Sequence, residues 1–78
     1  MNTVAMIGIC PVCNQGRLLI ARDKQTGKGY VACEGCEAEW ENPLASTDVS
    51  KVTRGRFGES VFLSLEEAST HPWKEFIK

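Results

Sequence analysis

Two pairs of cysteines constrain this chain of 78 residues more than any other feature of its sequence. Cys10 and Cys13 stand in the stretch CPVC, Cys33 and Cys36 stand in CEGC, and the sequence contains no other cysteine. Two residues separate the members of each pair, and nineteen residues separate the pairs. A gap of two residues lets a tight turn point both sulfurs at one place, and a hairpin between the pairs would bring the two turns face to face. The spacing therefore predicts one compact site built from all four thiols.

The C-x2-C-x19-C-x2-C arrangement falls in the range typical of a tetrahedral zinc site with four cysteine ligands. The short length of the chain supports this interpretation, because a domain of this size buries only about 60% of the surface that its unfolded form exposes. Small domains with such limited cores commonly rely on disulfides, a metal or a partner subunit. We therefore predict one zinc ion per chain as the cofactor, bound by Cys10, Cys13, Cys33 and Cys36.

Other uses of four thiols explain the pattern less well. Two disulfides, or four buried free thiols, would not require matched spacing within the two pairs. Redox chemistry at a single C-x-x-C motif usually begins a helix within a βαβ unit, and the sequence predicts no such unit. Iron also accepts four thiolates in tetrahedral geometry, so iron stays open as the alternative metal.

The residues around the two pairs predict short antiparallel strands joined by polar loops. Proline cannot donate to a strand ladder, so Asn42-Pro43 should end the strand that follows the second pair. No clear period is visible over 44–59, which we expect to be a loop with one helical turn. The predicted strands cover 3–9, 17–22, 30–33, 37–41 and 60–63, with a glycine-containing loop at 23–29.

The end of the sequence predicts helical structure. Ser64 and Glu67 have the spacing of a capping box, in which each side chain bonds the backbone N–H of the other residue. A terminal helix is expected from Pro72, because the missing N–H of proline is harmless at the first helical position. One face of that helix would dock on the sheet through Trp73, Phe76 and Ile77.

The stretch CPVCNQG followed by a strand, and YVACEGC followed by a strand that ends in tryptophan, resemble a zinc ribbon with rubredoxin-like knuckles. The resemblance covers residues 4–41 and implies a small antiparallel sheet with zinc held between two knuckles. Such knuckles often place glycine directly after the second cysteine, where this chain has Asn14 and Glu37. Asparagine tolerates a positive φ better than glutamate does. In the second turn, Gly35 is expected to supply a positive φ.

The predicted fold class is therefore a small, metal-stabilised, β-rich α+β domain. It consists of a zinc-ribbon antiparallel sheet with a short C-terminal helix. We expect one domain over residues 1–78, with a ribbon core at 4–41 and a C-terminal extension at 42–78 that resembles no family we can name.

The sequence predicts no catalytic residue and no enzyme. Four thiolates fill a tetrahedral site, whereas a catalytic zinc keeps one position open for water. His71 is the only histidine and has no nucleophile near it in the sequence, so we expect it to be solvated or to cap a helix. The serines lack the pattern of a nucleophile elbow, and the glycines miss the spacing of phosphate-binding loops.

The distribution of charge predicts a protein partner. Residues 30–50 carry five carboxylates and no lysine or arginine, although the net charge of the chain is only −1. Such a stretch fits a basic partner through complementary charge, but a solvated strand face is the simpler alternative. We expect a non-catalytic interaction module of the inhibitor, antitoxin, immunity-protein or regulatory-subunit kind. The predicted partner surface consists of Glu34, Glu37, Glu39 and Glu41.

Nucleic acid is the alternative partner, since zinc ribbons include many modules associated with DNA, RNA or transcription. Arg54 and Arg56 in TRGRFG pair two cations with an aromatic residue, as proteins that bind single strands can. The acidic second knuckle argues against this alternative, because affinity for nucleic acids comes largely from neutralising phosphates.

We expect the protein to be cytoplasmic and to have no membrane partner. No stretch approaches the roughly 18 consecutive apolar residues that a membrane-spanning helix needs. Residues 1–9 lack the basic leader, long apolar segment and cleavage site of a secretory signal.

Overall fold

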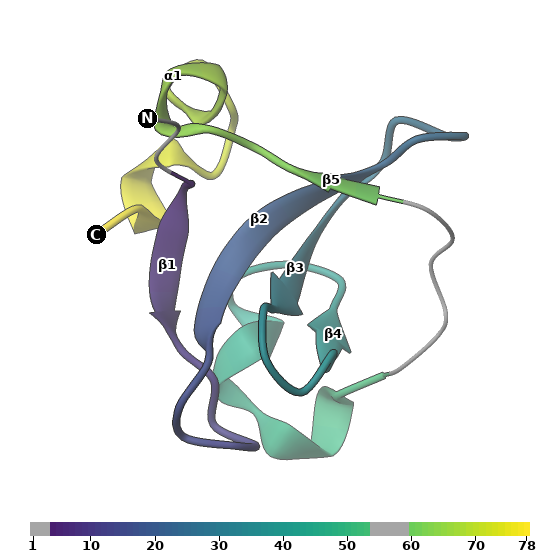
Figure 1. Cartoon of the computed structure of the whole chain (residues 1–78), viewed down its shortest axis with the longest axis vertical. Coiled ribbons are helices and arrows are strands. Elements are labelled where there is room, and N and C mark those ends of the chain that lie inside the picture. Colours follow the sequence, from purple (N-terminus) through teal and green to yellow (C-terminus); the bar gives the residue numbers. More distant parts are fainter. Residues whose placement is uncertain (1–3, 54–59) are drawn as a thin grey trace.

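One long strand, β2 (Arg17–Asp23), organises the sheet. The computed structural model describes residues 4–53 and 60–78. Strand β2 pairs antiparallel with β1 (Met6–Ile9) on one side and with β3 (Gly29–Cys33) on the other. The two-residue strand β4 (Glu39–Trp40) then extends the sheet beside β3, which gives the order β1-β2-β3-β4. The small antiparallel sheet predicted from the sequence is therefore present (Figure 1).

A fifth strand, β5 (Ser60–Phe62), pairs with the far end of β2 and brings the C-terminal part of the chain into the sheet. Strands β1 and β5 both pair with β2, each with a different segment of it, so β5 continues the line of β1 (Figure 1). The two meet at Ala5, whose N–H donates to the carbonyl of Leu63 at 3.0 Å. The N–H of Leu63 in turn donates to the carbonyl of Ile20 at 2.9 Å.

The loop between β2 and β3 is a tight polar turn, as its glycines predict. The carboxylate of Asp23 accepts the N–H groups of Gln25 at 2.8 Å and Thr26 at 3.4 Å. Gly27 has a φ of +74°, a conformation that residues with a side chain rarely adopt. These features fix the register of the β2–β3 hairpin, which positions the two cysteine pairs at its other end.

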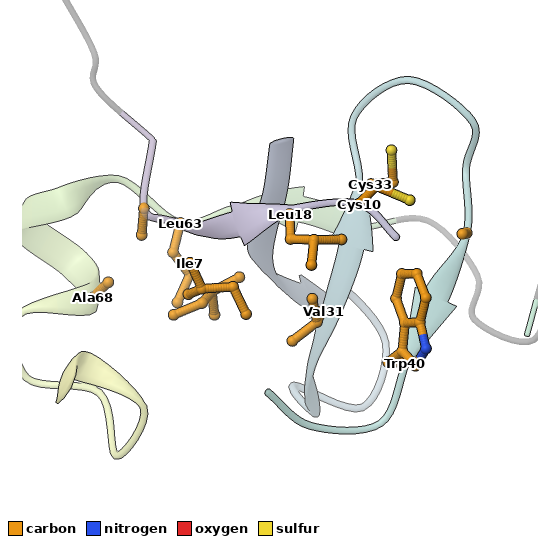
Figure 2. Packing of buried hydrophobic residues seen from close by; sticks show 11 residues of the cluster. Ile7, Cys10, Leu18, Val31, Cys33, Trp40, Leu63 and Ala68 are labelled. Carbon is orange, nitrogen blue, oxygen red and sulfur yellow. The ribbon is translucent and has the colours of Figure 1, made fainter. Parts of the chain in front are cut away.

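The main hydrophobic core lies on one face of the sheet. Figure 2 shows Ile7, Leu18 and Val31 on this face, with Trp40 beside them on the neighbouring strand. Trp40 is completely buried, and its indole N–H donates to the carbonyl of Asp48 at 3.0 Å. This hydrogen bond satisfies the polar atom of a side chain that would otherwise lose its contact with water. A smaller cluster consists of Ala21, Tyr30 and Ala32.

Helix α1 (Leu65–Ala68) begins with the capping box that the sequence predicts. The backbone N–H of Glu67 donates to the hydroxyl of Ser64, and the backbone N–H of Ser64 donates to the carboxylate of Glu67, both at 3.1 Å. The carboxylate also lies at the positive end of the helix, where negative charge is stabilising. The helix is a single turn, and it places the buried Ala68 in the main core.

The predicted terminal helix from Pro72 is wrong in extent, because only the 3-10 turn η3 (Lys74–Phe76) forms there. The Nδ1 atom of His71 accepts the backbone N–H of Trp73 at 3.1 Å. This bond forms a local turn that contains Pro72 and directly precedes η3. A side chain that bonds the nearby backbone in this way competes with helix formation. The predicted apolar face still packs on the core through Trp73, Phe76 and Ile77.

The segment after β4 contains two 3-10 turns, η1 (Ala45–Thr47) and η2 (Val49–Lys51), where the sequence predicted one helical turn. Asp48 caps η2, since its carboxylate accepts the backbone N–H of Ser50 at 2.9 Å. Nowhere in residues 4–53 or 60–78 does a helix reach the length and apolar character needed to cross a membrane.

Candidate metal centre

The two cysteine pairs form two knuckles of similar backbone structure. In the first knuckle, the N–H of Cys10 donates to the carbonyl of Gly16 at 2.9 Å. In the second knuckle, the N–H of Cys33 donates to the carbonyl of Ala38 at 2.8 Å. Each bond closes a short loop at the end of a strand, so each knuckle is a turn that the sheet itself holds in place.

The residue directly after the second cysteine of each pair adopts a left-handed conformation. Asn14 has a φ of 57° and Glu37 has a φ of 64°. This is the position that zinc-ribbon knuckles often give to glycine, and glutamate is strained there because its Cβ crowds the backbone. The expectation that Gly35 supplies the positive φ of the second turn is wrong, since the turn takes that conformation two residues later at Glu37.

The four sulfur atoms lie within 4.8 Å of one another, so a single ion between them could contact all four. The Sγ atoms of Cys10 and Cys36 are 3.7 Å apart, and those of Cys13 and Cys33 are also 3.7 Å apart. These separations are far longer than the roughly 2.05 Å of a disulfide bond. The structure therefore brings the four predicted ligands together as a metal site.

Backbone N–H groups point at the sulfurs of both knuckles. Gly16 donates to the Sγ of Cys13 at 3.3 Å, and Gly35 donates to the Sγ of Cys33 at the same distance. Further N–H groups, from Val12 and Cys36, lie 3.4 Å from the sulfurs of Cys10 and Cys33 respectively. Such donors stabilise a thiolate more than a neutral thiol, and the thiolate is the form that binds metals.

The pKa values of the thiols reflect two opposing influences. The backbone N–H groups of Gly16 and Gln15 lower the pKa of Cys13 to about 6. Burial raises the pKa of Cys33 to about 12, against the lowering effect of the N–H groups of Cys36 and Gly35. A buried thiolate at Cys33 therefore requires a compensating positive charge, which a metal ion in the centre of the four sulfurs would provide.

Gly16 is where the two knuckles touch. A Cβ atom added to Gly16 would overlap the Sγ of Cys33 and lie 3.1 Å from the backbone nitrogen of Gly35. In the sequence, Gly16 lies three residues after Cys13 and twenty residues before Cys36 of the second knuckle. Its contact with the second knuckle depends on tertiary structure, and the spacing of the glycine gives no signal of it.

The metal site connects the core to the surface. Cys10 and Cys33 are buried and belong to the main core, and Figure 2 shows them together at one end of the sheet, near Leu18. Cys13 and Cys36, one from each pair, are partly exposed. Each knuckle thus contributes one sulfur on the core side and one on the solvent side of the site.

Glu34, one of the four carboxylates of the predicted partner surface, pairs with Arg17. The guanidinium bonds the carboxylate through Nε and Oε2 and through Nη2 and Oε1, the second at 2.9 Å. The backbones are also joined, since the N–H of Glu34 donates to the carbonyl of Arg17 at 3.1 Å. The hydrogen bonds from Arg17 hold the pKa of Glu34 below its ordinary value. Glu34 therefore ties the second knuckle to the start of β2.

The other three carboxylates of the predicted partner surface alternate with buried residues along β4 and the positions on either side of it. Glu37 and Glu41 are exposed and Glu39 is half-buried, while Ala38 and Trp40 between them are buried. The backbone of Glu39 also pairs with Thr53, through two N–H to carbonyl bonds of 2.8 Å each. Arg54 and Arg56, the predicted nucleic-acid contacts, lie outside the described residues.

His71 is half-buried and does not cap η3, so it differs from the solvated or capping residue that the sequence predicts. Its Nδ1 atom accepts the N–H of Trp73, and the two rings lie with their centroids 5.0 Å apart. Its Nε2 atom faces Gly29, where an added Cβ would lie only 3.2 Å away. His71 therefore belongs to the packing between the C-terminal segment and the start of β3.

Comparisons of the chain with protein-family models, with curated proteins and with solved structures found no match.

Proposed function

We propose that this chain is a zinc protein whose single ion is structural and whose biological role is non-catalytic binding of another protein. The observation that carries the assignment of a metal site is the spacing of the sulfurs. A tetrahedral zinc site with Zn–S bonds of about 2.3 Å has neighbouring sulfurs about 3.8 Å apart. The pairs Cys10–Cys36 and Cys13–Cys33 are each 3.7 Å apart, which supports this geometry.

A structural rather than catalytic role follows from the donor set. Four thiolates complete the coordination of zinc, so the ion has no open position for water or substrate. The ion would cross-link the end of β1 to the end of β3, on either side of β2. A cross-link of this kind stabilises a chain whose core is small.

The proposed binding role rests on the glutamates that alternate with buried residues along β4 and its flanking positions. Glu37 and Glu41 are exposed and Glu39 is half-buried, while Ala38 and Trp40 between them are buried. A row of carboxylates attracts a basic surface and steers its approach. A protein of the inhibitor, antitoxin, immunity-protein or regulatory-subunit kind would bind a basic partner through such a surface. Glu34 contributes less to it than the sequence suggested, because Arg17 neutralises its charge.

Elemental analysis of the purified protein tests the metal assignment. We expect one zinc per chain, held by all four cysteines, after purification without added metal. Iron bound in the same proportion would replace zinc as the metal, since iron accepts the same donor set. Protein that is folded but contains no metal would overturn the proposal.

A charge reversal tests the binding role separately. Cross-linking in the native cells identifies the partner, and its association rate is then measured with the Glu41→Lys variant. We expect slower association, with a difference that fades as salt is added. Glu66→Lys, an equal charge change on the exposed side of α1, is the matched control and should have a smaller effect. Equal rates for the two variants, or tight binding of single-stranded oligonucleotides instead of a protein, would overturn this part of the proposal.

A further inference from the structure

An apolar cavity of about 550 Å³ opens along the outer edge of β1. Residues 43–47 border it on one side and residues 75–78 border it on another. The volume falls within the ~300–1,000 Å³ typical of ligand pockets. Apolar side chains provide most of its lining, namely Ile7, Ile9, Pro11, Leu18, Phe76 and Ile77.

Two side chains beside this cavity are unusually exposed for their type. Ile9 is 52% exposed and Leu44 is 75% exposed. They come from different segments of the chain, yet both line the same cavity. Contiguous exposed apolar surface of this kind marks a site of interaction more often than scattered apolar residues do.

The backbone of β1 offers unused hydrogen-bonding groups at the same edge. Residues that face each other in an antiparallel ladder alternate between bonded and non-bonded pairs. The N–H of Cys10 donates to the carbonyl of Gly16 across this ladder, so the backbone groups of the adjacent pair, Ile9 and Arg17, face away from each other. Arg17 confirms this, because its N–H and carbonyl both bond Glu34 on the opposite side. The N–H and carbonyl of Ile9 therefore point away from β2, toward the outer edge.

Among the backbone hydrogen bonds that residues 4–53 and 60–78 form outside the ladders, none uses these two groups of Ile9. A strand edge with such groups is a template for the backbone of another strand. The same edge already accepts a backbone donor further along, where the N–H of Lys78 bonds the carbonyl of Met6 at 2.9 Å. Ile77, just before it, is extended, with φ −69° and ψ 134°, and the C-terminal segment runs beside β1 (Figure 1).

We infer that the outer edge of β1 binds an extended, apolar, uncharged peptide segment of a partner protein, which joins the sheet as an additional strand next to Ile9. The backbone of the segment pairs with the N–H and carbonyl of Ile9 and continues the contact that Lys78 begins at Met6. Alternate side chains of the segment enter the cavity between Leu44 and Ile77. Glu75 and Lys78 are the only ionic side chains among the lining residues, and they carry opposite charges, so the site favours an uncharged segment.

This mode of recognition is β-augmentation, in which backbone hydrogen bonds provide affinity and pockets for alternate side chains provide specificity. The inference goes beyond the proposed function, because Glu37, Glu39 and Glu41 are not among the residues that line the cavity. It also does not depend on whether the metal is zinc or iron.

Selection from random dodecapeptides displayed on phage, with the metal-loaded full chain as bait, provides the first test. We expect enrichment of peptides with apolar residues at alternate positions and without charge between them. Selection of no peptides, or only of acidic or basic ones, would overturn the inference.

Hydrogen exchange then tests the backbone pairing with one enriched peptide. In the isolated protein, the outward N–H of Ile9 should exchange faster than the N–H of Cys10, which bonds Gly16. Bound peptide should slow exchange at Ile9 by about tenfold or more, since exchange then requires opening of the new strand. Peptide binding that leaves exchange at Ile9 unchanged would contradict strand addition.

Substitutions test the side-chain contacts. Ile9→Lys and Leu44→Lys should each weaken peptide binding by about tenfold or more, as central apolar contacts do. Val49→Lys is the matched control, because Val49 is 50% exposed and lies outside the cavity, and it should bind as the parent protein does. Leu44 lies outside the strands of the sheet, so its variant stays informative if Ile9→Lys fails to fold. Equal binding by Leu44→Lys and Val49→Lys would contradict the site.

Sedimentation of the protein without peptide distinguishes a second copy of the chain from a foreign partner. We expect a monomer across the concentrations used for binding. A dimer would overturn the inference of a partner segment if its formation slows hydrogen exchange at Ile9 and if the Leu44→Lys variant no longer forms it. The edge of β1 would then be a site of self-association.

Discussion

Gly16 of the first knuckle lies directly against the sulfur of Cys33 in the second knuckle, leaving no room for a side chain at that position. The contact joins the two halves of the metal site through a backbone position rather than through a ligand. The geometry of the four sulfurs therefore depends on a residue that binds no metal.

Gly16→Ala tests this dependence. The added methyl group would overlap the Cys33 sulfur, so one knuckle must move, and we expect metal affinity to fall by about tenfold or more, as it does when residues that orient metal ligands are changed. Competition with a chromophoric chelator measures the affinity. Gly8→Ala is the control, since a Cβ at Gly8 meets no atom within 4 Å, and it should leave the affinity unchanged. Equal affinities for the two variants would show that the knuckles adjust freely.

Removal of the metal should unfold the domain. Structural zinc contributes about 10–16 kcal/mol of apparent binding energy in zinc-finger peptides, which exceeds the stability of most small domains. We expect chelation to abolish the dispersed amide spectrum of the native fold and Cys33→Ser to prevent its formation. Added zinc should restore the chelated parent protein but not the variant. A dispersed spectrum that survives complete metal removal would contradict this dependence.

Glu37→Gly should stabilise the protein, which is unusual for a change to glycine. The left-handed conformation costs an ordinary residue about 1–2 kcal/mol, whereas glycine adopts it freely and loses about 0.5–1 kcal/mol in backbone entropy. The net gain is therefore between about 0 and 1.5 kcal/mol, and each kcal/mol raises Tm by roughly 4–8 °C in a domain of this size. Glu41→Gly is the control, because Glu41 lacks a positive φ, and its Tm should fall.

The Arg17–Glu34 pair should make stability depend on pH. Its hydrogen bonds lower the pKa of Glu34 in the folded protein, so the folded state binds the proton less readily than the unfolded state does. The pair therefore stabilises the protein above the unfolded pKa of about 4.3, and the effect disappears as pH falls through the lower, folded pKa.

The difference in stability between the parent protein and Glu34→Gln measures this effect, because loss of metal in acid affects both proteins alike. We expect a small difference at neutral pH, as is usual for exposed pairs, which shrinks in acid. The Glu34 carboxyl should titrate at a higher pH in Arg17→Met. An unchanged titration in that variant would show that Arg17 does not cause the shift.

The sequence is sufficient to predict the sheet and the metal site because both follow from local patterns. The spacing within CPVC and CEGC determines two turns, and the loop at 23–29 determines the hairpin that brings them together. The capping box of Ser64 and Glu67 is equally local, and the structure contains it. The two turns, the hairpin loop and the capping box each involve residues within a few positions of one another, and the hairpin then brings together cysteines that are 20 and 26 positions apart.

The features that the sequence did not predict depend on contacts across the sheet or on competing local bonds. Glu34 meets Arg17 only because the register of β2 and β3 places them together, and a count of nearby charges in the sequence misses this. The terminal helix shrinks to one 3-10 turn because the His71 side chain bonds the backbone of Trp73. Neither apolar periodicity nor the position of Pro72 contains that information.

The central place of β2 has a consequence for the order of folding. Its pairing with β3 joins neighbours in the chain, so this hairpin closes a short loop and forms at low entropic cost. Its pairing with β5 joins Asp23 to Ser60, which are distant in sequence, and contacts of that kind form slowly. The hairpin and its knuckles would therefore act as the folding nucleus, and the C-terminal strand and helix would condense on it last.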